Sequence, residues 1–241
     1  MFIRNFERSS CVKRVAMEHS RTSFALMFFL VGWLAQGNAS LNNRNHLTYV
    51  NSPYEIQREN NLTVVRAEPP PHELAAKMAR YIVHKSDWTA LATTSTHEPI
   101  KGFPFANIFS VSDGPIHKSK GIPYFYLTDM EISVQDLKED ARTTITMSLA
   151  QTNFCKKHQY DPEDPLCAHV ILTGTLVPVT DPSEKNFARQ ALFSRHPEMK
   201  DWPKDHGWWF GKLVISKICL LDYFGGIKDV NLDEYFATNP M

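Results

Sequence analysis

Short runs of β-branched and aromatic residues recur along the chain from residue 88 onward, and clusters of Gly, Pro and Asp separate them. Runs of this length and composition, bounded by turn-forming residues, are typical of β-strands. The connections between these runs suit antiparallel pairing. The predicted strands are WTALATT (88–94), FANIFSVS (105–112), PYFYLT (123–128), TTITMSLA (143–150), AHVILTGTLVPV (168–179) and KLVISKICLLDYF (212–224).

Three other segments have helical character. Residues 72–86 place apolar side chains at helical spacing. Residues 131–140 form a second short helix with Ser133 as its expected N-cap, and residues 183–193 a third with Asp181 as its cap. Six strands with so few helices predict a mainly β domain, a barrel or a sandwich, rather than a doubly wound α/β sheet.

The start of the chain predicts a secretory signal peptide. Five Lys and Arg side chains precede an apolar run at 24–35, and Gly37 and Ala39 occupy the −3 and −1 positions of a cut after residue 39. A membrane-spanning helix needs roughly 20 apolar residues, so we expect cleavage and no membrane insertion. Met17 would begin a leader of more usual length. The protein is therefore expected to be secreted, and to reside outside the cell or in endosomes and lysosomes.

A flexible Asn-rich lead-in of residues 40–71, ending in three prolines, precedes the predicted domain of residues 72–241. The whole chain has 26 Lys and Arg and 26 Asp and Glu. Removing the leader takes away five basic and two acidic side chains, which leaves a net charge of −3. A slightly acidic domain lacks the broadly basic surface on which many nucleic-acid-binding proteins rely, so no nucleic-acid partner is expected.

Three cysteines remain after the leader. Cys155 and Cys167 bracket the polar segment KKHQYDPEDPL, which has the composition of a surface loop. A disulfide that closes this loop in an oxidising compartment and a pair of free thiols stay equally open at this point. Cys219 lies in an apolar run and is predicted to be a buried free thiol.

The sequence offers no catalytic motif. It has no G-x-S-x-G, H-E-x-x-H, P-loop, G-x-G-x-x-G or C-x-x-C pattern. His158 and His169 are too far apart for close metal-ligand spacing, and a Cys155 nucleophile with His158 as base competes with the disulfide. The aromatic segment 202–210 is interpreted as packing rather than as a ligand platform. The adjacent acidic pairs Glu139–Asp140 and Glu163–Asp164 are interpreted as solvated turns. We therefore expect no catalytic, cofactor-binding or metal-binding residue.

Seven sequence motifs stand out along the domain: SDWTALAT (86–93), GFPFA (102–106), DGP (113–115), PYFYL (123–127), LAQTNFCKKH (149–158), RHPEMK (195–200) and LDYFGG (221–226). In this order they resemble the CREG family, the cellular repressors of early-region-stimulated genes, over about residues 72–236. The resemblance implies the FMN-binding split-barrel fold of pyridoxamine-phosphate-oxidase-like proteins, with an occluded flavin cleft and no assigned catalysis. It also implies a secreted or lysosomal homodimeric glycoprotein that acts on growth, differentiation and endolysosomal function, and a link through its glycans to the cation-independent mannose 6-phosphate receptor.

Two glycosylation sites are expected. Asn61-Leu-Thr is a standard sequon, and Asn153-Phe-Cys is the rarer thiol form, which matches a glycosylation site of the family. Use of Asn153 requires Cys155 to be reduced when the glycan is added. Two other sequons familiar in the family are missing, at 176–181 and 213–216. Receptor recognition through those two glycans is therefore not expected, and Asn61 is the alternative attachment site.

A flavin-binding oxidoreductase is the competing interpretation. A flavin phosphate needs fixed cationic and hydroxyl donors, for which Arg142-Thr143-Thr144, assisted by Lys101 or Lys138, are the best candidates. An ordinary strand start with an exposed Arg explains the same residues and is preferred. Direct repression in the nucleus is disfavoured by the leader and by the lack of a Lys/Arg-rich tract, so effects on transcription would be indirect.

Overall fold

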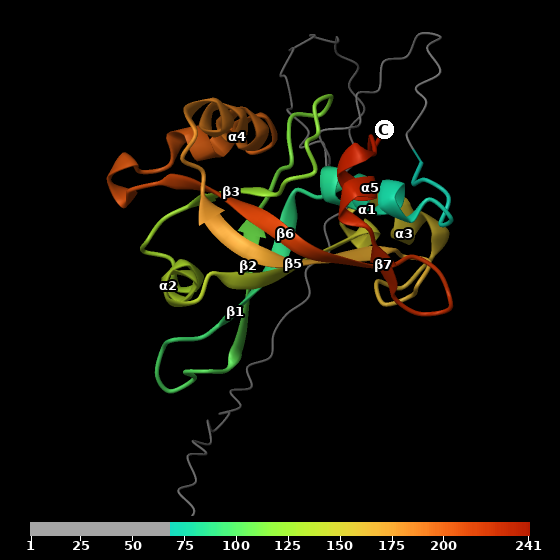
Figure 1. Ribbon diagram of the computed structural model, residues 1–241, viewed down its shortest axis with the longest axis horizontal. Coiled ribbons are helices and arrows are strands. Elements are labelled where there is room, and N and C mark those ends of the chain that lie inside the picture. Colours follow the sequence, from blue (N-terminus) through green and yellow to red (C-terminus); the bar gives the residue numbers. More distant parts are fainter. Residues whose placement is uncertain (1–67) are drawn as a thin grey trace, which may run out of the picture. The chain divides into compact units, whose positions relative to one another are not determined.

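The structure, a computed structural model, describes residues 68–241 as an antiparallel sheet with a few short helices around it (Figure 1). The strand order is β2-β1-β4-β5-β6-β3, and β7 pairs with β6. The predicted leader and most of the lead-in lie outside the described residues. The strands are β1 (Trp88–Thr94), β2 (Pro104–Ser110), β3 (Tyr124–Leu127), β4 (Arg142–Ser148), β5 (His169–Pro178), β6 (Trp209–Leu221) and β7 (Lys228–Val230).

The helices cover the two ends of this sheet. Figure 1 shows α1, α3 and α5 near β7 at one end, and α2 and α4 at the other. Among the described residues, no helix is both long and apolar enough to cross a membrane. The helices are α1 (Ala75–Lys85), α2 (Ile132–Glu139), α3 (Asn153–His158), α4 (Pro182–Arg195) and α5 (Leu232–Ala237), with 3-10 turns at Leu149–Gln151, Pro197–Asp201 and Lys204–His206.

The sheet curls into a barrel that is split along the seam between β2 and β3. Beyond the end of β2, Ser112 and Tyr124 exchange two backbone hydrogen bonds, which link this end of the sheet to β3. The long strands β5 and β6 bend where their register shifts after Thr173. Gly174 permits this close approach, because a Cβ there would lie 2.1 Å from the Val214 carbonyl oxygen. The predicted mainly β architecture is confirmed.

Alternation of buried and exposed residues along the strands places the main core inside the curl. Leu91, Ile145 and Leu172 are fully buried there, and α1 contributes Ile82 to the same cluster. A second cluster forms under α4 around Tyr124, Leu192 and Phe210. Both clusters hold the sheet in its curled shape by removing apolar surface from water.

The opposite face of β1, β2 and β4 is left partly exposed by residues 68–241. We call it the open face. Trp88 and Ile108 are 44% and 60% exposed on it, and the register pairs Ala90 with Ile108 on one side and with Thr146 on the other. Its members are Trp88, Ala90, Ala92, Ala106, Ile108, Thr144 and Thr146.

Several predicted boundaries were wrong in detail. The helix predicted from residue 72 begins at Ala75, and the strand predicted at 212–224 begins at Trp209 and ends at Leu221. Glu131, not Ser133, caps α2, because its carboxylate accepts a hydrogen bond from the Val134 backbone N–H. The Ser133 side chain is buried instead. The predicted strand at 143–150 ends at Ser148, where a 3-10 turn follows.

Candidate functional site

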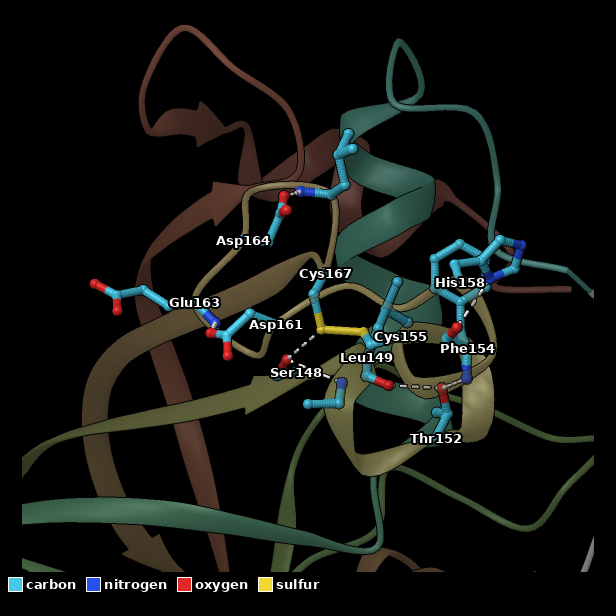
Figure 2. Close-up of a disulfide and its surroundings, with 12 residues drawn as sticks. Ser148, Leu149, Thr152, Phe154, Cys155, His158, Asp161, Glu163, Asp164 and Cys167 are labelled. Atoms are coloured by element: carbon cyan, nitrogen blue, oxygen red, sulfur yellow. Dashed lines mark hydrogen bonds between the residues drawn. A yellow bond between two sulfur atoms is a disulfide. The ribbon is translucent and has the colours of Figure 1, made fainter.

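A disulfide joins Cys155 and Cys167, whose Cα atoms are 5.4 Å apart (Figure 2). Both residues are almost completely buried. The bridge ties α3 to the segment just before β5, which begins at His169, so the predicted polar loop is only partly a loop. Its first part is helical because the Thr152 hydroxyl accepts from the Phe154 backbone N–H and donates to the Leu149 carbonyl.

Asn153, the predicted glycosylation residue, is the first residue of α3 and is exposed. Its sequon partner Cys155 is buried and is part of the disulfide. The folded, oxidised protein therefore presents an accessible asparagine without the thiol that the rarer sequon requires. Asn61, the other predicted site, lies outside the described residues.

His158 lies near Cys155 in the sequence but serves α3 instead. Its Nδ1 is 2.9 Å from the Phe154 carbonyl oxygen, and its ring stacks near Phe154 and Tyr160. Cys155 in a disulfide has no thiolate to attack a substrate, so the structure does not form the Cys–His pair considered above. No group of three or more His, Cys, Asp or Glu side chains within residues 68–241 is arranged to hold a metal ion.

The candidate flavin-phosphate residues do not converge. Arg142 is exposed, and its guanidinium donates three hydrogen bonds to Asp140. These bonds, the Arg142 backbone N–H and the guanidinium charge lower the pKa of Asp140 to about 2. Thr143 points inward and donates to the Ala92 carbonyl, while Thr144 lies 3.0 Å from the Thr173 hydroxyl.

The two candidate lysines are also separate from Arg142. Lys138 forms an ion pair with Asp129, with 2.6 Å between Nζ and Oδ2. Lys101 lies in the turn between β1 and β2 and is exposed. Arg142 and Lys138 thus each hold a different carboxylate, and the structure does not gather them around one anion.

The aromatic segment packs on β3. Tyr126 has its ring centroid 5.0 Å from both Trp208 and Phe210, and the Trp202 ring stacks on it at 6.0 Å. Trp209 points elsewhere and donates its Nε1–H to Asp129. The rings are engaged mainly with one another, which agrees with the packing interpretation.

Comparison with known proteins decides the family. A family profile described as "CREG, beta-barrel" matches residues 70–237. The chain belongs to the CREG family. It is 55% identical to "Protein CREG1" of Gallus gallus over 179 residues, which cover 73% of this chain and 93% of that protein. "Protein CREG1" of Homo sapiens is 53% identical over 167 residues, with 69% and 76% covered, and "Protein CREG2" of Mus musculus is 41% identical over 187 residues, with 78% and 64% covered.

Solved structures share the fold of this CREG domain at low sequence identity. The heme binding protein from Mycobacterium smegmatis aligns with a TM-score of 0.54 at 18% identity, covering 68% of this chain and 60% of that one. Campylobacter jejuni ChuZ aligns with a TM-score of 0.51 at 12% identity, covering 73% and 68%. At such identities the likeness concerns the fold alone, and it is the split barrel that the family resemblance implies.

No local sequence pattern predicts the buried polar network of this CREG domain. Asp113 is completely buried, and its carboxylate accepts from the Ser119 hydroxyl and the Gly121 backbone N–H and contacts His84 Nδ1 at 2.7 Å. Arg80 donates to the same Ser119 hydroxyl at 2.8 Å. The motif Asp113-Gly-Pro is recognisable in the sequence as a turn and as a motif shared with the family. Its partners on α1 are about thirty residues away, and no local spacing connects them to it.

Proposed function

We propose that this chain is a non-enzymatic, secreted or lysosomal glycoprotein that works as a homodimer. It regulates growth, differentiation and endolysosomal function, with indirect effects on transcription. The observation that carries the proposal is membership of the CREG family over residues 70–237, nearly the whole described domain.

The disulfide supports the compartment. Disulfides form and persist in the oxidising secretory pathway and outside the cell, and they are rare in the cytosol. The Cys155–Cys167 bridge therefore agrees with the signal peptide predicted at 1–39. After secretion, a glycan on Asn61 would be the handle for the cation-independent mannose 6-phosphate receptor or another cell-surface receptor.

The open face supports the homodimer. It presents Trp88, Ile108 and several small side chains on the sheet surface, and no helix within residues 68–241 buries Trp88 or Ile108. Contiguous exposed apolar surface on a folded domain marks an interaction site, and a second copy of the same face would bury it. The β2 strand, which forms one edge of this surface, has no fully buried residue.

The ion pairs of Arg142 and Lys138 favour the non-enzymatic interpretation over a flavin oxidoreductase. A flavin phosphate at β4 would have to displace Asp140 from the Arg142 guanidinium, and Lys138 would have to leave Asp129. Each displacement breaks a charge-assisted hydrogen bond.

Flavin titration and light scattering on one sample test the proposal. The secreted, glycosylated protein should elute with the mass of a dimer, remain colourless, and leave FMN fluorescence unchanged on titration. A yellow preparation, or FMN binding that is lost in an Arg142→Ala variant, would replace it with the flavin-enzyme interpretation. A monomer mass would overturn the homodimer.

A further inference from the structure

A cavity of about 640 Å³ lies between α1, the segment that joins β2 to β3, and the C-terminal residues around α5. Arg80 and His84 line it from α1, residues 116–120 from the connecting segment, and residues 236–241 from the C-terminal side. Its lining includes three permanently charged basic side chains, Arg80, Lys118 and Lys120, and no acidic side chain. This volume is within the range of small-molecule sites.

Arg80 lines this cavity from α1, and it is 2% exposed. Its guanidinium is held between two groups. The Tyr235 ring lies 5.2 Å from Cζ, and Gly121 packs so closely that a Cβ there would lie 2.7 Å from the same atom. The Tyr235 carbonyl and the Ser119 hydroxyl accept from the two terminal nitrogens. These contacts fix the plane of the guanidinium.

The Nε–H of Arg80 remains without an acceptor, although this atom is buried. Within residues 68–241 no carboxylate forms an ion pair with Arg80. A buried guanidinium normally has a carboxylate or another anion beside it, because an uncompensated charge and an unmade hydrogen bond both cost free energy in a site shielded from water.

The nearest buried carboxylate, Asp113, does not supply the missing charge, because His84 already matches it. The Ile116 carbonyl can only accept, so His84 Nε2, 2.9 Å away, carries a proton. A second proton lies between Nδ1 and Asp113 Oδ1, which are 2.7 Å apart. Whichever atom holds that proton, the His84–Asp113 pair has no net charge. The His84–Asp113 pair therefore provides no negative charge to compensate the guanidinium of Arg80.

Lys118 and Lys120 add to this positive charge at the same cavity. Both side chains are exposed, and their ammonium groups lie 5.8 and 4.0 Å from the centroid of the Phe187 ring, which is not a lining residue, so they supply charge at the rim rather than a fixed contact inside the cavity. Neither forms an ion pair with a carboxylate in the part of the chain that the structure describes. Even when the main-chain carboxylate of Met241 is counted, the three basic side chains leave the lining with two excess positive charges, which favours a doubly charged ligand group over a singly charged one.

We propose that this cavity binds the phosphate group of a small phosphorylated molecule, with Arg80 as its fixed donor and Lys118 and Lys120 as charge at the rim. Phe236 and the residues after it supply a less polar wall for the rest of the ligand. The proposal does not depend on the function proposed above, because it involves neither the open face nor the candidate flavin residues.

The test uses the full-length secreted protein labelled with ¹⁵N, and phenyl phosphate as the probe. Phenyl phosphate should shift the Arg80 Nε–H resonance and the amides of residues 116–120 and 236–241, and inorganic phosphate should do the same more weakly. Benzoate, which has one negative charge, should bind less tightly than phenyl phosphate. Absence of shifts with both phosphates, or tighter binding of benzoate, would overturn the phosphate assignment.

Variants locate the binding. A double Lys118→Gln/Lys120→Gln variant changes only exposed side chains, and it should weaken phenyl phosphate binding several-fold. The matched control, Lys200→Gln/Lys204→Gln, removes two exposed charges elsewhere and should leave binding unchanged. Arg80→Lys keeps the charge but loses the planar donors, so binding should weaken further. Equal affinity in all three variants would reject this cavity as the site.

Vesicles distinguish the two sources of a phosphate group. Phosphatidylcholine vesicles that contain phosphatidic acid should sediment with the protein if the natural ligand is a lipid headgroup, and the Lys118→Gln/Lys120→Gln variant should lose this association. If phenyl phosphate binds and the vesicles do not, the ligand is a soluble phosphate ester. Vesicle binding that the double variant retains would contradict a role of this cavity in lipid recognition.

Discussion

Asp140 and Arg142 form an exposed ion pair at the start of β4, and its effect on titration is measurable. The pair holds the pKa of Asp140 at about 2. In an Arg142→Gln variant this pKa should rise toward the ordinary value of about 3.9, because the guanidinium bonds and charge are gone. Carboxyl-detected NMR titration measures the midpoint, and Lys217→Gln serves as a distant control.

The sign of the linked stability follows from the direction of this shift. A lowered pKa means that the folded protein favours the ionised carboxylate. The stabilising contribution of Asp140 to the free energy of unfolding is therefore fully present above the unfolded pKa of about 3.9. It is lost as the pH falls through about 2. An Asp140 midpoint that stays near 2 without the guanidinium would show that Arg142 is not held by this carboxylate and is available to a ligand.

Cys155 decides whether Asn153 can be glycosylated. Asn153 is exposed, but the hydroxyl or thiol that the sequon needs is absent once Cys155 is oxidised. Cys155→Ser breaks the bridge and creates a standard Asn153-Phe-Ser sequon. We expect this variant to gain a glycan at Asn153, seen as a mass increase that an N-glycosidase removes.

Cys155→Ala is the matched control for this experiment, because it also breaks the bridge but provides no hydroxyl. It should gain no glycan at Asn153. If the wild-type protein already carries a full glycan there, the thiol sequon is used before the bridge closes, and oxidation does not limit the site.

At the scale of elements, the disulfide fixes α3 against β5. The linked residues are 12 apart in the sequence, and closing a loop of this size in the unfolded chain is worth about 3 kcal/mol. A Cys155→Ala/Cys167→Ala variant should lose about this much free energy of unfolding, measured by urea denaturation of the secreted protein.

Cys219→Ala provides the comparison, because Cys219 is a free, half-buried thiol outside the bridge. Its loss should have a much smaller effect than removal of both bridged cysteines. If the double variant is as stable as the wild type, the bridge does not restrict the unfolded chain, and the loop-entropy argument fails here.

The presence of a helix or strand was predictable where the local sequence pattern determined it, but the residues at which the elements begin and end were often not. Residues 88–94 combine an aromatic residue with three β-branched residues, which predicts a strand, and β1 has these bounds. The short β7 was missed, because its three residues have no period of their own and pair only when β6 is already in place. Ser133 was the predicted N-cap of α2, but its side chain is buried by tertiary packing, and Glu131 caps the helix instead.

At the scale of the whole molecule, the curled sheet was predictable as a class but its charge distribution was not. The number and spacing of the predicted strands indicated a barrel or a sandwich. The sequence motifs shared with the CREG family indicated the split barrel. The network of Arg80, His84 and Asp113 depends on α1 lying against the connection between β2 and β3. A lone His and a lone Arg on a predicted helix carry no signal of such a contact, because exposed and buried basic residues look the same in one sequence.

The open face leads to the last prediction, which concerns assembly. Ile108 is 60% exposed on β2, the edge strand of this face, and pairs with Ala90 of β1. In the proposed homodimer its side chain would be buried against the second copy. An Ile108→Asp variant would place a carboxylate there, and burial of an unpaired charge costs several kcal/mol. The variant should therefore run as a monomer in light scattering while keeping the circular dichroism of the wild type.

Leu74→Asp is the matched control, because Leu74 is 49% exposed, lies outside the open face, and occupies the N-cap position of α1 where Asp is favourable. It should remain a dimer. If Ile108→Asp remains a dimer and Leu74→Asp does not, the partner contacts the end of the sheet that carries α1. If both remain dimers, neither surface holds the two copies together, and the exposed Trp88 and Ile108 would serve a partner other than a second copy of this chain.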